Sequence, residues 1–242
     1  MPVSGRGPAP ELPPGDRVRL ADLTTALEQI AVALEREPSV RADFEALRRA
    51  HALADDASLY RDYVRVRLVF ESARDGGLWQ LRWAITDREA NSDAIWSQWA
   101  RLGAWGGEAD RPTATAECDE LSALFAFLTR RLGVARVGLF WPTSNHTVAV
   151  WTARGEDGKP VRLVVPTSQI FLGEADSLGT SGFDPRRQKI IYDYGRKDAR
   201  DDDAIPAALA RFFVRRSWAE ALRPQAELQR ARNERSRALG GS

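Results

Sequence analysis

A cysteine and a histidine are the side chains of this sequence whose types and positions favour covalent chemistry. Cys118 is the only cysteine, and His146 is one of two histidines. The segment after Cys118 repeats apolar residues at helical spacing, and the segment after His146 alternates as strands do. A thiolate attacks carbonyl carbons, and a nearby imidazole can accept the thiol proton. The pair therefore predicts acyl transfer by a thiol nucleophile.

The segment that contains Cys118 is predicted to be an amphipathic helix with the thiol in its first turn. Thr113 or Thr115 is expected to cap this helix, and Gly133 is expected to end it. Apolar residues at positions 121, 124, 125, 128 and 132 mark its buried face. The helix dipole favours a thiolate at this end. Acidic residues at positions 117, 119 and 120 oppose the thiolate, so the thiol needs a cationic imidazole close by.

Three strands are predicted after the helix. Residues 134–141 are mostly apolar and are expected to stop at Pro142, and residues 146–152 are expected to be their antiparallel neighbour. Residues 161–171 are expected to return as the third strand after a Gly-containing turn. A later segment, residues 188–195, is expected to extend the same sheet. Helix, strand, turn and strand then lead back to the first turn of the cysteine helix.

The other segments are expected to surround this core. Residues 1–16 are rich in Pro and Gly and are expected to be a disordered tail. Residues 17–222 are interpreted as one α+β domain with N-terminal helices, and residues 223–242 as an Arg-rich C-terminal helix or tail. Alternating apolar residues over 64–70 and 78–85 predict a β-hairpin. Helices are expected over residues 17–34, from a cap at Ser39, over residues 92–103 and from residue 205 onward.

Composition excludes several classes of function. The 242 residues carry 35 basic and 34 acidic side chains, and a net charge of +1 gives no general attraction to nucleic acid or to an anionic membrane. One cysteine forms no internal disulfide, and no secretory signal or apolar run of about 20 residues is present. No CxxC, HExxH or phosphate-loop motif is present. We therefore expect a cytoplasmic protein without cofactor or metal. The acyl transfer predicted for Cys118 and His146 implies that its partner is a protein or peptide substrate.

The block AECDELSALFAFLTRRLGVARVGLFW, residues 116–141, resembles the transglutaminase-like branch of papain-fold proteins. Members of that branch show a small residue, a cysteine and an acidic or polar residue, followed by an Ala/Leu-rich helix with an RRLG-type end. A strand follows, and then a histidine that opens the next strand. The resemblance covers roughly residues 90–170. It implies an α+β core in which an antiparallel sheet packs against a central helix that starts at the cysteine. It also implies that Cys118 is the nucleophile and His146 the general base.

The sequence departs from this family at the residue that orients the imidazole. An Asp-Pro-Thr motif usually ends the third strand, and here Val165-Pro166-Thr167 stands in its place. Thr167, Ser168 or Gln169 could supply the orienting hydrogen bond, and Gln169 and Thr167 are the favoured candidates. Asp184, which also precedes a proline, ranks below them because it lies beyond a Gly-rich loop.

Two functions follow as hypotheses, and a third is weaker. The first is acyl transfer on amide bonds by a Cys118–His146 pair, as in a cysteine peptidase or a transglutaminase-like acyltransferase. The alternative is a catalytically weak or inactive transglutaminase-like module that binds other proteins, which Val165 motivates. The third is a ligand surface formed by Trp79, Trp83 and Trp96.

Overall fold

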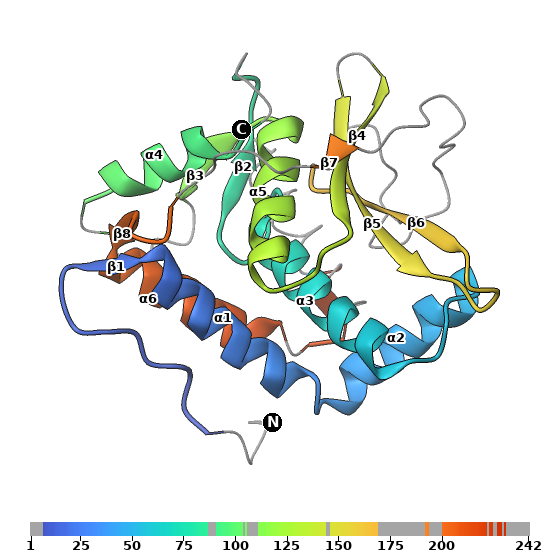
Figure 1. Cartoon of the computed structure of the whole chain (residues 1–242). Helices are drawn as coiled ribbons and strands as arrows, with labels where there is room; N and C mark the ends of the chain where they lie inside the picture. Colours follow the sequence, from blue (N-terminus) through green and yellow to red (C-terminus); the bar gives the residue numbers. More distant parts are fainter. Residues whose placement is uncertain are drawn as a thin grey trace.

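The computed structural model describes residues 7–86, 91–103, 105, 111–143, 146–168, 192–193, 200–221, 223–224, 227–228 and 230. For residues 141–143, 146, 192 and 193 it describes the backbone only. The chain folds as a mixed α+β protein, as predicted, with helices on one side of a four-stranded sheet (Figure 1). The helices are α1 Leu20–Leu34, α2 Pro38–His51, α3 Ala57–Ala73, α4 Asp93–Arg101, α5 Cys118–Arg131 and α6 Ala207–Glu220. The strands are β1 Arg17–Arg19, β2 Leu81–Trp83, β3 Ala114–Ala116, β4 Val137–Thr143, β5 His146–Arg154, β6 Pro160–Val165, β7 Tyr192–Asp193 and β8 Ala204–Pro206.

The main sheet has the strand order β6-β5-β4-β7, and every neighbouring pair is antiparallel. This confirms the predicted pairing of the three strands after the cysteine helix and the extension of the sheet by the later segment. β4 continues through Pro142 instead of stopping there. The pairing with β5 shifts register between Phe140 and Thr143. Such an irregularity accommodates a proline, whose nitrogen cannot donate a ladder hydrogen bond.

Helix α5 lies between this sheet and α3 (Figure 1). It begins at Cys118 as predicted, but its cap is Glu117, and the expected caps Thr113 and Thr115 belong to the β3 region. Glu117 and Glu120 form a capping box in which the Glu117 N–H donates to Glu120 Oε2 over 2.9 Å. Gly133 follows the helix with φ +87°, the left-handed conformation that glycine favours at this position.

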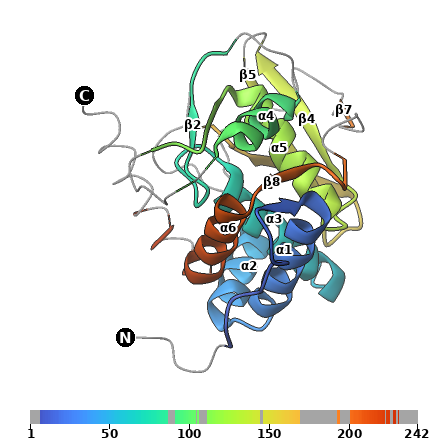
Figure 2. The same cartoon turned by 90° about the vertical axis from the view of Figure 1, so that its left-hand side faces the viewer.

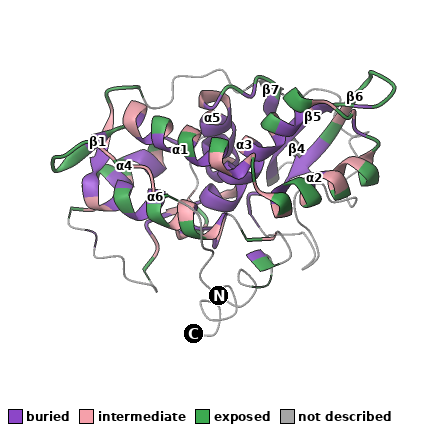
Figure 3. Cartoon of the chain, turned by 90° about the horizontal axis from the view of Figure 1, so that it is seen from below, coloured by how far each residue is buried: buried purple, intermediate pink, exposed green. Residues whose placement is uncertain are grey.

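The predicted hairpin over residues 64–70 and 78–85 is wrong, because the first of these segments lies in helix α3. Nearly every residue in the second half of α3 is buried, because α1, α2, α5, α6 and β5 pack around it. A helix buried on all sides has apolar residues on all sides, so no helical period survives in its sequence. Figure 3 shows the buried residues running through α3 and α5. The second segment does contain a strand, β2, which pairs in parallel with β3.

Two short segments that are far apart in the sequence pair in a small antiparallel ribbon. Val18 of β1 pairs with Ile205 of β8, and α1 therefore begins at Leu20 rather than at Arg17. Figure 2 shows α6 beside α1 and α3, beneath this ribbon. Residues 7–16 form no helix or strand. The packed part of the chain continues past residue 222, since Leu228 is buried in the core.

Most of the tryptophans in the described residues build the core. Trp79 stacks on Phe213 with ring centroids 4.4 Å apart, and Trp96 meets Trp99 edge to face at 4.9 Å. Trp79 and Trp99 are fully buried. The prediction that Trp79 belongs to a ligand surface is therefore wrong. In the described residues, no helix combines the length and the apolarity that a membrane crossing requires.

Candidate functional site

Cys118 is the first residue of α5, and its half-buried sulfur lies against the start of β5. The backbone N–H groups of Thr147 and of Asp119, in the first turn of the helix, face this sulfur and lower its pKa. The first N–H groups of a helix have no partner within the helix, so they are free to bind a sulfur or an oxyanion. The structure thus places the thiol one residue along β5 from His146.

The surroundings of Cys118 hold the thiol in its neutral form. Burial raises the pKa of Cys118 above its ordinary value, because a thiolate loses hydration there. The Thr147 N–H opposes this rise in pKa, and the carboxylates of Asp119 and Glu117 add to it. The helix start therefore does not activate the thiol by itself, and a proton acceptor is needed for reaction near neutral pH.

Ser122 lies one turn after Cys118 and ties the helix to two strands. Its hydroxyl donates to the Thr147 carbonyl oxygen over 3.3 Å and lies 2.7 Å from Thr167 Oγ1. Thr147 therefore turns both its N–H and its C=O toward α5: the N–H faces the Cys118 sulfur, and the C=O accepts from the Ser122 hydroxyl. This end of β5 presents an edge to the helix. The backbone of His146 pairs with Thr143, and its imidazole lies outside the described part of the structure.

The end of β6 contains the residues from which a third group was predicted. Val165 is fully buried, pairs with Ala149 and belongs to the core that α5 shares. Thr167 is buried, and its hydroxyl is bonded to Ser122. Ser168 is 1% exposed, and its hydroxyl has no hydrogen-bond partner among the described residues. Gln169 and Asp184 lie outside the described residues. We name the residues Ser122, Thr147, Thr167 and Ser168 the buried polar cluster.

Two residues, one within the cluster and one beside it, were not singled out from the sequence. Ser122 had a usable signal, because it follows Cys118 by four residues and so shares its face of the helix. Asp75 lies in the connection between α3 and β2. Its N–H donates to the Thr167 carbonyl oxygen over 2.8 Å, and its Oδ1 accepts from the Trp83 N–H over 2.8 Å. Only the tertiary structure brings Asp75 to the end of β6.

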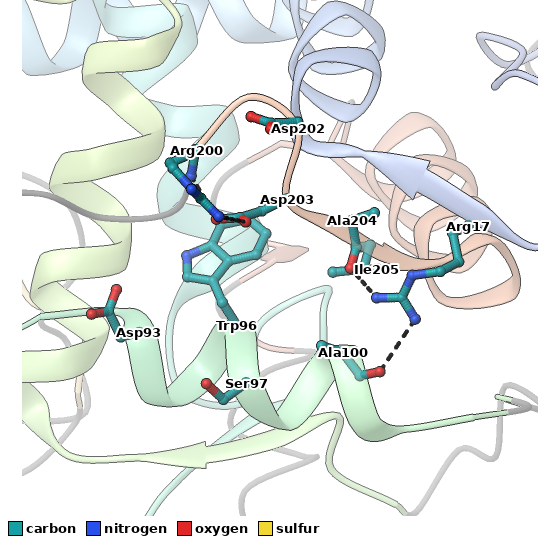
Figure 4. A pocket seen from close by; sticks show the side chains of 10 residues that line it. All are labelled: Arg17, Asp93, Trp96, Ser97, Ala100, Arg200, Asp202, Asp203, Ala204 and Ile205. Atoms are coloured by element: carbon teal, nitrogen blue, oxygen red, sulfur yellow. Dashed lines mark hydrogen bonds and ion pairs between the residues drawn. The ribbon is translucent and has the colours of Figure 1, made fainter.

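A large cavity of about 980 Å³ lies elsewhere, between α4 and the chain before β8 (Figure 4). It is lined by Arg17, Asp93, Trp96, Ser97, Ala100, Arg200, Asp202, Asp203, Ala204 and Ile205. Arg200 pairs with Asp203, and Arg17 donates to the carbonyl oxygens of Ala100 and Ala204. The cavity lies near the C-terminal half of α5, away from Cys118. Two contacts show this: Trp96 packs against Phe127, and Asp201 pairs with Arg131.

The site therefore belongs to the class of a cysteine at a helix start, packed against the edge of an antiparallel strand. Among the residues whose positions the structure gives, no three His, Cys, Asp or Glu side chains converge as a metal site would require. Comparisons with protein-family models, curated proteins and solved structures found no match to the chain.

Proposed function

We propose that this protein is a thiol-dependent acyl transferase that acts on amide bonds of a protein or peptide, through a core of the transglutaminase-like, papain-like kind. One observation carries the proposal: Thr147, the residue after His146, turns its backbone toward the start of α5, where its N–H faces the sulfur of Cys118 and its C=O accepts from Ser122. The contact joins the only cysteine of the chain to the strand that begins with His146. A nucleophile and a base from separate elements meet in this way in Cys–His sites.

The chemistry would run in two halves. As the Cys118 sulfur attacks the carbonyl carbon, the imidazole of His146 takes the thiol proton, and the carbonyl oxygen becomes an oxyanion. Backbone N–H groups at the start of α5 would stabilise this oxyanion. The tetrahedral intermediate then expels the amine, which takes the proton from His146, and a thioester remains. Water releases the acid in hydrolysis, or a second amine gives transamidation, and in each case His146 accepts the incoming proton and returns it to the sulfur.

The electrostatics favour proton transfer during the attack. Burial and the acids Glu117 and Asp119 raise the pKa of Cys118, so the resting sulfur carries its proton. A base that takes the proton as the sulfur–carbon bond forms avoids a stable thiolate in this acidic turn. The neutral state also protects the thiol from oxidation, which follows thiolate character.

A second candidate function is a non-catalytic module that binds other proteins. The burial of Val165 in the apolar core favours it, because no carboxylate stands at the position where the family usually has one. In that case Cys118 would be a small half-buried side chain that packs against Thr147. The two functions differ in whether His146 affects the reactivity of the thiol.

The test is the rate at which iodoacetamide alkylates Cys118 as a function of pH. The single cysteine makes the measurement specific. For the acyl transferase we expect the alkylation rate of the wild type to rise near neutral pH. His146→Asn should remove this rise. The variant should then react only at higher pH than a small free thiol does. His51→Asn, at the other histidine, is the matched control and should keep the rise. A wild-type rate that never exceeds that of a free thiol and shows no dependence on His146 would exclude the enzyme and leave the module.

A further inference from the structure

We infer that the cavity between α4 and the β1–β8 ribbon is a second binding site, and that it takes a basic segment of a protein partner through a lysine or arginine side chain. The cavity lies away from Cys118, so this inference does not rest on the proposed function. Its volume of about 980 Å³ stands at the upper end of the roughly 300–1,000 Å³ that ligand sites in proteins have. It therefore has room for a length of peptide.

One wall of the cavity is a single face of α4. Asp93, Trp96, Ser97 and Ala100 follow one another at spacings of three and four residues, so they lie on the same side of the helix. The opposite wall is β8 with the turn before it. Arg17 reaches from β1 to the last turn of α4, where it donates to the Ala100 carbonyl oxygen and joins the two walls (Figure 4). The small side chains of Ser97 and Ala100 leave the space between the walls open.

The cavity has an apolar side and an acidic side. Ala204 and Ile205 lie on the side of Arg17, and Asp93 lies on the opposite side, with Trp96 between them (Figure 4). Lysine and arginine have the same division, because an apolar stem carries their charged head. The stem of such a side chain would pack on the apolar side, and its head would meet the carboxylates.

The groups that remain available in the cavity favour a cation. Its two arginines are engaged, since Arg200 pairs with Asp203 and Arg17 donates to backbone carbonyl oxygens. The carboxylates of Asp93 and Asp202, in contrast, have no hydrogen bond or ion pair among the residues that the structure describes. Asp93 is also the first residue of α4, where the helix dipole favours a negative charge. The two available carboxylates would therefore attract a positively charged group.

A segment of a protein suits the cavity better than a free amine does. The residues from Asp93 to Ala100 span about 10 Å of α4, and β8 runs along the other wall. A lone ammonium group would leave most of this length empty. Ion pairs at exposed carboxylates are also weak one by one. Contacts of a peptide along both walls would add to the attraction of its charged side chain.

The test follows the indole N–H signals of the protein by NMR while a peptide is added, acetylated and amidated Gly-Lys-Gly-Lys-Gly. Trp96→Phe identifies the signal of Trp96 by its loss. We expect the peptide to shift this signal and to leave that of Trp151, which packs against Tyr63, in place. The dependence of the shift on peptide concentration gives the Kd.

Substitutions in the cavity should change this Kd in opposite directions. Asp93→Asn and Asp202→Asn should each raise it roughly twofold to fivefold, the range for an exposed ion pair. Arg200→Gln should lower it, because a cation is removed and Asp203 is released from its ion pair. Asp55→Asn, at an exposed position between α2 and α3, changes the net charge equally and should leave the Kd unchanged.

The inference fails if the lysine peptide leaves the Trp96 signal in place, or if Asp55→Asn weakens binding as much as Asp93→Asn does. A peptide with glutamate in place of lysine should cause no shift, and its binding would instead show an anion site at the arginines. Spermidine should bind more weakly than the peptide. Equal or tighter binding of spermidine would show a site for small amines and would overturn the assignment of a protein segment.

Discussion

The hydroxyl oxygens of Ser122 and Thr167 lie 2.7 Å apart in the interface between α5 and the sheet. Both side chains are buried, and Ser122 also donates to the Thr147 carbonyl oxygen. One helix residue thus joins two strands. Because Ser122 is one turn from Cys118, these bonds also determine where the sulfur lies relative to β5. We regard this polar contact as the main restraint on the geometry of the proposed site.

Removal of either hydroxyl should destabilise the fold. In Ser122→Ala or Thr167→Val a buried partner is left unsatisfied, and we expect each variant to lose about 1–3 kcal/mol of unfolding free energy. The double variant should lose less unfolding free energy than the sum of the two single losses. With both hydroxyls removed, neither is left buried without the other. Urea unfolding followed by circular dichroism measures this. Thr25→Ala is the control, since its hydroxyl bonds only to the preceding turn of α1 on an exposed face. Additive losses would contradict the shared bond.

Asp75→Asn should stabilise the protein at neutral pH. Burial raises the pKa of Asp75, so the folded state holds its proton more tightly than the unfolded chain does. Stability from this group is therefore highest below the unfolded pKa of about 3.9, and it falls as the pH rises through the folded pKa. An asparagine oxygen keeps the Trp83 N–H bond without the charge.

We expect a gain on the order of 1 kcal/mol or less at pH 7 for this variant. Below the unfolded pKa of Asp75 the gain should disappear, because the wild-type carboxyl is then neutral. Thermal unfolding at several pH values tests this, and Asp202→Asn on the exposed turn before β8 is the comparison. A lower melting temperature at pH 7 would show that the charge of Asp75 is needed by a neighbour.

Asp56→Ala should weaken the start of α3. Asp56 caps this helix, and Oδ1 accepts from Ser58 Oγ over 2.6 Å and from the Leu59 N–H over 2.8 Å. These bonds, that of Ser58 first, lower the pKa of Asp56 to about 2. A helix cap of this type contributes about 1 kcal/mol.

The pH dependence of this contribution has the opposite sign to that of Asp75. Because the folded pKa of Asp56 is depressed, its stabilisation is present above the unfolded pKa of about 3.9 and is lost as the pH falls toward 2. Chemical unfolding of wild type and Asp56→Ala at pH 7 and pH 2.5 compares the two states. Asp55→Ala, at the exposed neighbour, should change little. An unchanged difference between wild type and Asp56→Ala at the two pH values would contradict the assignment.

The local pattern of the sequence was sufficient for the elements that carry the proposed chemistry. Spacing of three and four residues predicted the helix from Cys118, and Gly133 ends it as expected. Apolar and alternating segments separated by turn residues predicted an antiparallel ladder from β4 to β6. These elements are amphipathic and joined by short turns. The apolar positions within each element therefore show which of its faces is buried.

Helix α3 shows where that reasoning fails. Its residues Val64, Val66, Leu68 and Phe70 alternate with charged and apolar neighbours and suggested a strand. The second half of this helix is buried around its circumference, so helical periodicity gives no signal there. The β1–β8 ribbon was also missed, because its partners, such as Val18 and Ile205, are far apart in the chain.

For the site, the sequence alone determined which side chains could react, and it predicted that they lie at the starts of a helix and a strand. It named Cys118 and His146, and it showed that Val165 stands where an acid is expected. The tertiary structure decided that Thr147 meets the sulfur, that Ser122 holds Thr167, and that Asp75 reaches the end of β6. These contacts join residues distant in the chain, and they depend on strand register and helix packing, which no local pattern of residues encodes.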